Sequence, residues 1–228
     1  MHARHELISA GHRRHGSKRD FKKPSDHFKR SSMDISREQL DEAIAVLKRG
    51  GVVVFPTETA YGLAADATNS EATQRVCEIK ERIQEKVLPI IAADRAMVER
   101  VAGIPSGFNR LVTRYWPGPL TLILPALSEQ LAPGVIANDE VAVRVSSHPV
   151  ARALSEGLGQ PIVSTSANKS GEPVCYSIQD VRDQLGALPD YYLDAGELIP
   201  EPPSTIVTLD DYGLPEVLRQ GGIKIDEL

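Results

Sequence analysis

The stretch Gly51-Val-Val-Val-Phe-Pro-Thr-Glu-Thr-Ala-Tyr-Gly62 changes from apolar to polar at Pro56. Its first half is an uninterrupted run of β-branched and aromatic residues, which is typical of a strand buried on both faces. α/β proteins commonly bind ligands in the loop after such a strand, because side chains and free backbone donors emerge there. A turn in which threonine hydroxyls satisfy the backbone is the alternative interpretation. The candidate site residues in this loop are Thr57, Glu58, Thr59 and Tyr61.

Helical and strand patterns alternate on both sides of this stretch. Before it, Ser36 and Gln39 form a capping-box pattern, and the apolar face that follows ends at Gly50. After it, apolar residues at helical spacing predict a helix over residues 70–80. The other elements expected are strands at 88–92, 120–124, 141–145, 162–164, 191–194, 205–209 and 216–219, and helices at 96–101, 107–115, 150–157 and 178–185. This alternation predicts an α/β fold.

Two cations separated by one residue, Lys80 and Arg82, stand where the second expected helix ends. About eighty residues later, Ser166 and Asn168 lie in a Gly- and Ser-rich loop full of hydroxyl and amide donors. Cations combined with such donors suit a polyphosphate better than an apolar ligand, which indicates a nucleotide-handling enzyme. The helix dipole alone also favours cations at a helix C-terminus, so a purely structural role is the alternative for Lys80 and Arg82.

Arg144 lies within the alternating strand Val141-Ala-Val-Arg-Val145. Because side chains alternate between the two faces of a strand, Arg144 lies on the opposite face from Val143 and Val145. The pattern leaves two positions open for its guanidinium, exposure to solvent or a place in a binding cleft.

Residues 1–33 are expected to form a disordered, basic, His-rich tail, and residues 34–228 the catalytic domain. Residues 1–32 contain nine Lys and Arg against three Asp and Glu, a net charge of +6, so the total of −5 leaves −11 for the remainder. With so few apolar residues, the tail cannot bury enough surface to offset its ordering entropy. A start nearer Met33, or electrostatic attraction of the tail to RNA, are the other interpretations.

The two cysteines, Cys77 and Cys175, are far apart and have no metal-ligand spacing, so neither a disulfide framework nor a zinc site is indicated. The sequence shows no secretory signal and no membrane-spanning stretch. We therefore expect a cytoplasmic protein without a membrane partner.

Five sequence blocks, in order over about residues 36–223, resemble the YrdC-like threonylcarbamoyl-AMP synthase family. They are Pro56-Thr-Glu-Thr-Ala-Tyr-Gly62, the pair Lys80-x-Arg82 and Ser166-x-Asn168, Trp116-Pro-Gly-Pro-Leu-Thr121, Val141-Ala-Val-Arg144, and Pro203-Ser-Thr-Ile-Val207 with Leu218-Arg-Gln-Gly-Gly222. The resemblance implies a twisted mixed α/β sheet with flanking helices and a broad basic cleft. Because few residues follow Arg219, the short, single-domain form of the family is expected.

The activity that the resemblance implies joins L-threonine, bicarbonate and ATP into threonylcarbamoyl-AMP and pyrophosphate, for threonylcarbamoyladenosine modification of tRNA. Mg²⁺ is expected to arrive with ATP, without an assigned protein ligand. A separate threonylcarbamoyl transferase is the expected downstream partner, and a contact with tRNA or other RNA is a further expectation. The alternatives are an RNA-binding or ribosome-maturation module of the same fold, and a relative that forms a carbamoyl-adenylate from carbamoyl phosphate.

The resemblance also implies which residues form the site. Lys80 and Arg82 are expected on the cleft surface as the catalytic cations. The residues expected to bind threonine or ATP are Thr57, Thr59, Lys86, Arg144, Ser166, Asn168, Ser204 and Arg219. The chain departs from the family at Ile83 and Val87, where proline is usual.

Deletion of residues 1–32 is expected to leave adenylate formation within about twofold of the full chain, because a terminal segment of this composition contributes little to a packed site. Threonine-dependent release of pyrophosphate from ATP measures this. A large fall in turnover would show that the leader shapes the site.

Overall fold

The computed structural model describes residues 35–81, 87–127 and 129–225, and these residues belong to one compact unit. The predicted tail of residues 1–33 lies outside this part. The helices are α1 (Arg37–Lys48), α2 (Ser70–Ile79), α3 (Arg95–Val101), α4 (Asn109–Tyr115), α5 (Pro149–Leu158) and α6 (Ile178–Leu185). The strands are β1 (Val53–Pro56), β2 (Tyr61–Ala64), β3 (Ile90–Ile91), β4 (Leu120–Pro125), β5 (Glu140–Arg144), β6 (Ile162–Val163), β7 (Thr165–Ser166), β8 (Tyr191–Tyr192), β9 (Thr205–Leu209) and β10 (Pro215–Arg219). The sequence predicted counterparts of all of these elements except β2 and β7.

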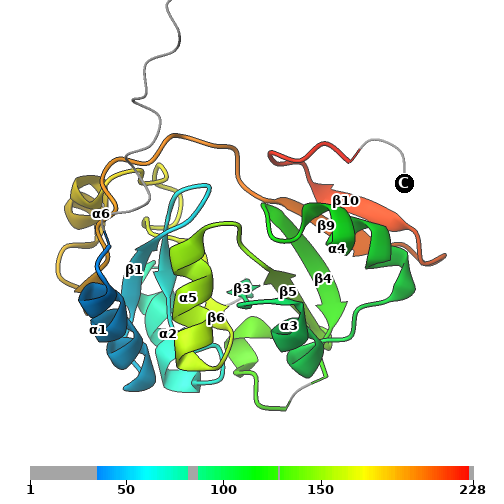
Figure 1. Cartoon of the computed structure of the whole chain (residues 1–228), viewed down its shortest axis with the longest axis horizontal. Helices are drawn as coiled ribbons and strands as arrows, with labels where there is room; N and C mark the ends of the chain where they lie inside the picture. Colours follow the sequence, from blue (N-terminus) through cyan, green and yellow to red (C-terminus); the bar gives the residue numbers. More distant parts are fainter. Residues whose placement is uncertain (1–34, 82–86, 128, 226–228) are drawn as a thin grey trace, which may run out of the picture. The chain divides into compact units, whose positions relative to one another are not determined.

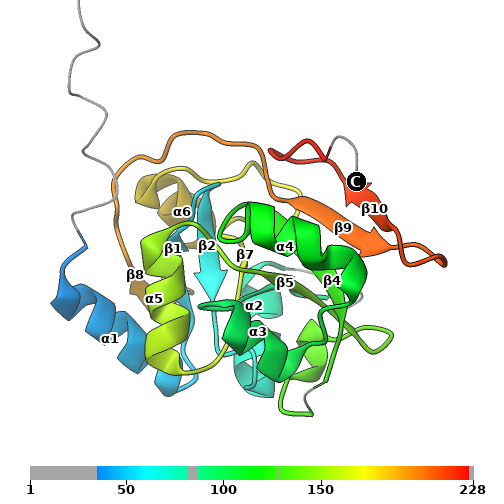
Figure 2. The ribbon, with the colours of Figure 1, turned by 45° about the vertical axis from the view of Figure 1, so that its right-hand side comes forward.

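The strands form two mixed sheets (Figures 1 and 2). One has the order β7-β2-β1-β8, and the other has the order β10-β9-β4-β5-β3-β6. Each combines antiparallel pairs, such as β1 with β2 and β4 with β5, and parallel pairs, such as β1 with β8 and β4 with β9. An isolated bridge between Asp66 and Ile162 connects the two sheets. The expected mixed α/β architecture is confirmed, with two sheets in place of one.

Strand β1 is buried on both faces, as its apolar run predicted. Val53 and Phe55 pack with α1 and α5 in one core cluster, while Val52 and Val54 belong to a second cluster. α1 and α5 lie side by side over this sheet (Figure 1). They approach so closely at Gly157 that an added Cβ would lie 2.3 Å from Cδ1 of Ile44.

The polar loop after β1 is a tight hairpin turn that leads into β2. The Thr57 amide donates to the Ala60 carbonyl over 3.1 Å, and Phe55 pairs with Gly62 in an antiparallel register. The prediction of a longer loop was wrong because β2 has a poor strand signal: glycine and alanine are depleted in strands, and all its residues are buried without alternation. The polar residues therefore stand at a fixed corner of a sheet.

Asp190 fixes the start of β1 against the segment that leads into β8. Its Oδ2 accepts from the Val52 amide at 2.7 Å, and Arg75 of α2 donates to both carboxylate oxygens at 2.6 and 2.8 Å. Burial alone would raise the pKa of Asp190, but the hydrogen bonds from Arg75 and Val52 lower it below its ordinary value. The carboxylate is thus more stable as an anion in the folded chain.

Asp190→Asn is expected to lower the unfolding free energy at pH 7 by about 2 kcal/mol, because charge-assisted hydrogen bonds are lost. A carboxylate whose pKa is lowered by folding stabilises the folded chain at pH values above its unfolded-state pKa. The difference in unfolding free energy between Asp190→Asn and wild type should therefore shrink as the pH falls below about 4. Urea unfolding at pH 7 and pH 3 tests this, with the exposed Asp211→Asn as control. An equal loss at both pH values would contradict the account.

Candidate active site

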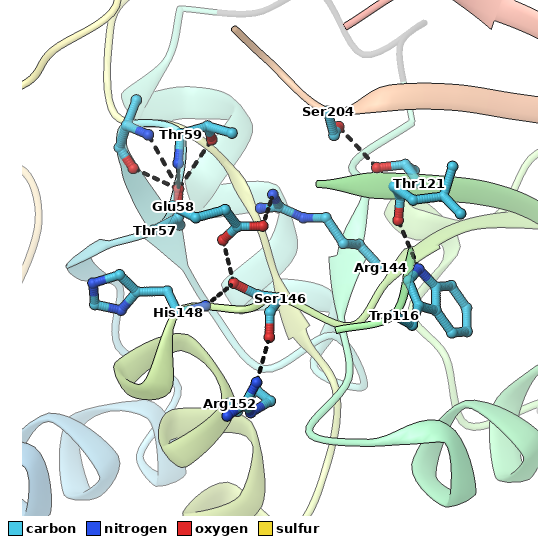
Figure 3. Close-up of polar contacts among 12 residues, drawn as sticks. Thr57, Glu58, Thr59, Trp116, Thr121, Arg144, Ser146, His148, Arg152 and Ser204 are labelled. Atoms are coloured by element: carbon cyan, nitrogen blue, oxygen red, sulfur yellow. Dashed lines mark hydrogen bonds and ion pairs between the residues drawn. The ribbon is translucent and has the colours of Figure 1, made fainter. Parts of the chain in front are cut away.

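A buried ion pair joins the turn of one sheet to the end of a strand in the other. Arg144, the last residue of β5, donates from Nη1 to Oε1 of Glu58 over 2.7 Å (Figure 3). The two side chains are only 9% and 14% exposed. The sequence left two positions open for Arg144, and the structure places it in the interior, pointing toward the turn of residues 57–60.

Arg144 keeps donors that the ion pair does not use. Burial lowers the pKa of its guanidinium, and the carboxylate of Glu58 partly offsets this effect. An arginine nevertheless stays protonated in proteins. Among the described residues, Glu58 is the hydrogen-bonding partner of this guanidinium, and no fully buried side-chain nitrogen lacks a partner. The remaining nitrogens of Arg144 therefore keep some contact with solvent.

The segment after Arg144 holds the second carboxylate oxygen of Glu58. Ser146 donates a short hydrogen bond from Oγ to Oε2 of Glu58 and accepts from the His148 amide at 3.1 Å. Arg152 of α5 donates to the Ser146 carbonyl over 3.0 Å. Burial is the largest cause that lowers the pKa of His148, and the charge of Arg152 adds to it while Glu58 opposes it. His148 is therefore neutral at pH 7, and its Nδ1 accepts from the Val150 amide to cap α5.

The two threonines of the turn have different positions. Thr57 is 6% exposed, and its Oγ1 donates to the Ala60 carbonyl at 2.7 Å and accepts from the amides of Thr59 and Ala60. Thr57 thus closes the turn, which is the alternative interpretation of this loop, a turn in which threonine hydroxyls satisfy the backbone. Thr59 is less buried, and its hydroxyl lies 3.1 Å from that of Thr57. Thr59 is the hydroxyl of this turn that is better placed to meet a ligand.

A second cation of this sheet is Arg219, which is tied to Ser204. Arg219, at the end of β10, donates to the carbonyl and hydroxyl of Ser204 at 2.7 and 3.1 Å, and Thr121 of β4 donates to the same hydroxyl at 2.9 Å. Burial and the positive charge of Arg144 lower the pKa of Arg219. An anion bound near Arg219 would offset this unfavourable effect of the Arg144 charge.

Glycine allows the chain after Arg219 to pass directly along the backbone that carries Ser204. An added Cβ at Gly221 would lie 2.0 Å from the Pro203 carbonyl oxygen and 2.6 Å from the Thr205 nitrogen. Thr205 Oγ1 in turn accepts from the Gly221 amide. Gly221, two residues after Arg219, thus allows this close approach to the backbone of residues 203–205.

Lys80 is buried, which contradicts the expectation that it lies on a cleft surface. Its side chain is 4% exposed, and its Nζ donates to the carbonyls of Ser166 and Asn168 at 2.5 and 2.7 Å and to Asn168 Oδ1 at 3.3 Å. Sequence reasoning was right to pair these blocks. The expected surface position of Lys80 was wrong, and its catalytic role stays a prediction; in this structure the ammonium holds the loop that carries Ser166 and Asn168.

The loop held by Lys80 lies beside the hairpin that contains the polar turn. Ser166 pairs with Gly62 of β2 in an antiparallel register, and the Ala167 amide donates to the Tyr61 carbonyl at 2.9 Å. Arg82 and Lys86 lie outside the described residues, as does Ile83. Among the residues that are described, no cluster of three or more His, Cys, Asp or Glu side chains could hold a metal ion.

A cavity of about 390 Å³ lies next to the polar side chains around Arg144 and Ser146. Asp94 and Arg95 at the start of α3, Trp116 after α4, and Arg152 of α5 are among the residues that line it. Arg152, which lines this cavity, is also the residue that donates to the Ser146 carbonyl. None of the predicted site residues within the described ranges lines this cavity, so its shape alone would not have located them.

Ser146 hydrogen-bonds Glu58 and Thr121 hydrogen-bonds Ser204, but neither was predicted as a site residue. Glu58 was predicted only as a candidate in the loop after the first strand. A serine two positions beyond Arg144, and a threonine inside an apolar strand, are weak signals because both types are common in buried structure. Glu58 carried a stronger signal, since it stands between two threonines directly after a buried strand, and a carboxylate that is buried there requires a partner.

Comparisons with known proteins identify similar chains. The family model described as "Telomere recombination", of Sua5, YciO and YrdC, matches residues 45–221. The threonylcarbamoyl-AMP synthase of Bacillus subtilis (strain 168) is 38% identical over 192 residues, 83% of this chain and 55% of that protein. The synthase of Vibrio vulnificus (strain YJ016) is 38% identical over 151 residues, 65% of this chain and 81% of that protein.

The crystal structure of P. abyssi Sua5 complexed with L-threonine resembles this fold with a TM-score of 0.75 and 37% identity. The match covers 80% of this chain and 54% of that one. This chain thus spans just over half the length of the Bacillus and P. abyssi relatives.

Lys80→Met is expected to lower the unfolding free energy by about 3 kcal/mol, because three buried oxygens lose a charged donor. Thermal and urea unfolding measure this. The control is Lys169→Met in the same loop, whose exposed ion pair with Glu81 should be worth less than about 1 kcal/mol. If Lys80→Met were as stable as the control and yet inactive, the ammonium would be a ligand-binding group and not a support of the loop.

Proposed function

This chain belongs to the Sua5/YciO/YrdC family, and from that premise we propose that it is an L-threonylcarbamoyladenylate synthase. It joins L-threonine, bicarbonate and ATP into threonylcarbamoyl-AMP and pyrophosphate. The observation that carries the proposal is the pair of guanidiniums of Arg144 and Arg219. They come from β5 and β10 of one sheet, the charge of Arg144 lowers the pKa of Arg219, and both keep donors for anionic groups.

Arg144 binds the carboxylate of threonine through the nitrogens that Glu58 does not occupy. A planar guanidinium suits a carboxylate because two parallel hydrogen bonds fix both position and orientation. Thr59 and Ser204 offer hydroxyls to the amino acid. The complex of P. abyssi Sua5 with L-threonine supports this assignment through the similarity of the two folds.

The chemistry requires positioning more than a protein nucleophile. The neutral threonine amine attacks the bicarbonate carbon and water is lost, which gives an N-carboxylate; an oxygen of this carboxylate then attacks the α-phosphorus of ATP and expels pyrophosphate. Two anions that repel each other must be brought together, and charge develops on the phosphate in the transition state. Fixed cations serve both needs because they require little reorganisation during the reaction.

The nucleotide lies toward Arg219, Ser166 and Asn168. Ser166 and Asn168 are presented by the loop that Lys80 holds, so Lys80 acts on the nucleotide through that loop. Arg82 and Lys86 supply positive charge to the phosphates. Mg²⁺ accompanies ATP and neutralises phosphate oxygens, held mainly by phosphate and water.

The adenylate passes to a separate threonylcarbamoyl transferase that modifies tRNA, in the cytoplasm. Of the helices in the described ranges, none is both long and apolar enough to cross a membrane. A direct contact with tRNA is part of this proposal, and the basic residues of positions 1–32 would provide it electrostatically.

The purified full chain is expected to release pyrophosphate from ATP only when both L-threonine and bicarbonate are present. Arg144→Lys keeps the charge but loses the planar fork, so kcat/KM for threonine should fall about 10- to 100-fold. The exposed Arg110→Lys is the matched control. Mass spectrometry of the product distinguishes threonylcarbamoyl-AMP from simple ATP hydrolysis.

Other outcomes would identify the alternatives. Tight, salt-sensitive RNA binding without threonine-dependent pyrophosphate release would indicate an RNA-binding module. Pyrophosphate release that requires carbamoyl phosphate in place of threonine and bicarbonate would indicate a carbamoyl-adenylate-forming enzyme. Either result would overturn the proposal.

A further inference from the structure

Glu58 uses both of its carboxylate oxygens on one short segment of the neighbouring sheet. Oε1 accepts from Arg144 Nη1 at 2.7 Å, and Oε2 accepts from the hydroxyl of Ser146. Figure 3 shows the carboxylate reaching from the turn across to these two side chains. One carboxylate therefore fixes two side chains of the segment 144–146.

Both ends of this contact are held in place. On the side of Glu58, Thr57 closes the turn with three hydrogen bonds to Thr59 and Ala60. On the other side, the His148 amide and the Arg152 guanidinium hold Ser146. A side chain supported in this way keeps its direction when the group it contacts is engaged by a ligand.

The contact leaves the rest of the guanidinium directed away from Glu58. In the part of the chain that is described, no other residue hydrogen-bonds the Arg144 side chain, and no buried nitrogen there is sealed without a partner. Arginine has many rotamers, and binding a ligand with an unsupported arginine would require ordering it first. Glu58 performs that ordering before the ligand arrives.

We propose that Glu58 is a positioning residue that directs the free nitrogens of Arg144 at the carboxylate of the substrate amino acid. This rests on the proposed function, which names threonine as that amino acid. Glu58 acts through Arg144 and not on threonine itself, because both of its oxygens are already engaged by Arg144 and Ser146. For ligand binding, the contribution of Glu58 is reach and direction, whereas its negative charge serves the stability of the buried guanidinium in the fold.

Two substitutions separate reach from charge. Glu58→Gln keeps an acceptor oxygen at the same distance from Arg144 but removes the charge. Glu58→Asp keeps the charge but is one methylene too short to contact both Arg144 and Ser146. The matched control is Glu156→Asp, an exposed acid on α5.

The measurement is the affinity of the full chain for L-threonine by isothermal titration calorimetry without ATP, with ATP affinity measured separately. We expect Glu58→Asp to bind threonine about tenfold more weakly, and Glu58→Gln and Glu156→Asp to stay within about threefold of wild type. ATP affinity should be unchanged in all of them. If Glu58→Gln lost affinity as Glu58→Asp does, or if Glu58→Asp bound as wild type does, the proposal would be overturned.

A double-mutant cycle tests whether Glu58 acts through Arg144. Arg144→Ala should weaken threonine binding, and the addition of Glu58→Ala should weaken it no further, because no guanidinium is left to direct. Independent losses that multiply in the double variant would show a separate contact of Glu58 with threonine and refute the proposal.

The binding readout does not depend on turnover. Threonine binding that follows this pattern without pyrophosphate release would contradict the synthase proposal and support the role of Glu58. A wild-type chain that does not bind threonine would overturn the role of Glu58 itself.

Discussion

The buried ion pair between Glu58 and Arg144 is the interaction on which the rest of the site depends. A guanidinium that is almost fully buried needs a counter-charge, since removing one partner of such a pair costs about 3 to 5 kcal/mol. The partner comes from the turn of one sheet, and the cation comes from the last residue of a strand in the other. The fold therefore brings the two sheets together at a point that has both charge and unused hydrogen-bond donors.

Lys80, Arg144 and Arg219 have different physical roles because they differ in their hydrogen-bonding partners and, for Arg219, in burial. Lys80 is surrounded by carbonyl oxygens and shapes a loop. Arg144 has one carboxylate partner and free donors, and Arg219 is tied to Ser204 while it remains exposed. Buried ammonium groups suit the first role, because three donors can satisfy several carbonyls, whereas a planar guanidinium suits anion recognition.

Local signals in the sequence predicted most of the fold, and long-range contacts decided the site. The capping box at Ser36 and the apolar run of β1 depend on neighbours within a few residues, so both were predicted correctly. Glu58 and Arg144 are 86 positions apart, and no periodicity reveals such a contact. The burial of Lys80 was missed for the same reason, because a cation at a helix end looks alike in sequence whether solvent or backbone oxygens surround it.

A crystal structure of the full chain with L-threonine and a non-hydrolysable ATP analogue tests the central claim most directly. The account predicts that the threonine carboxylate hydrogen-bonds the free nitrogens of Arg144 while Glu58 keeps its contacts with Nη1 and Ser146, and that the nucleotide lies toward Arg219 and the loop held by Lys80. Threonine bound away from Arg144, or bound there by displacing Glu58 from the guanidinium, would contradict it.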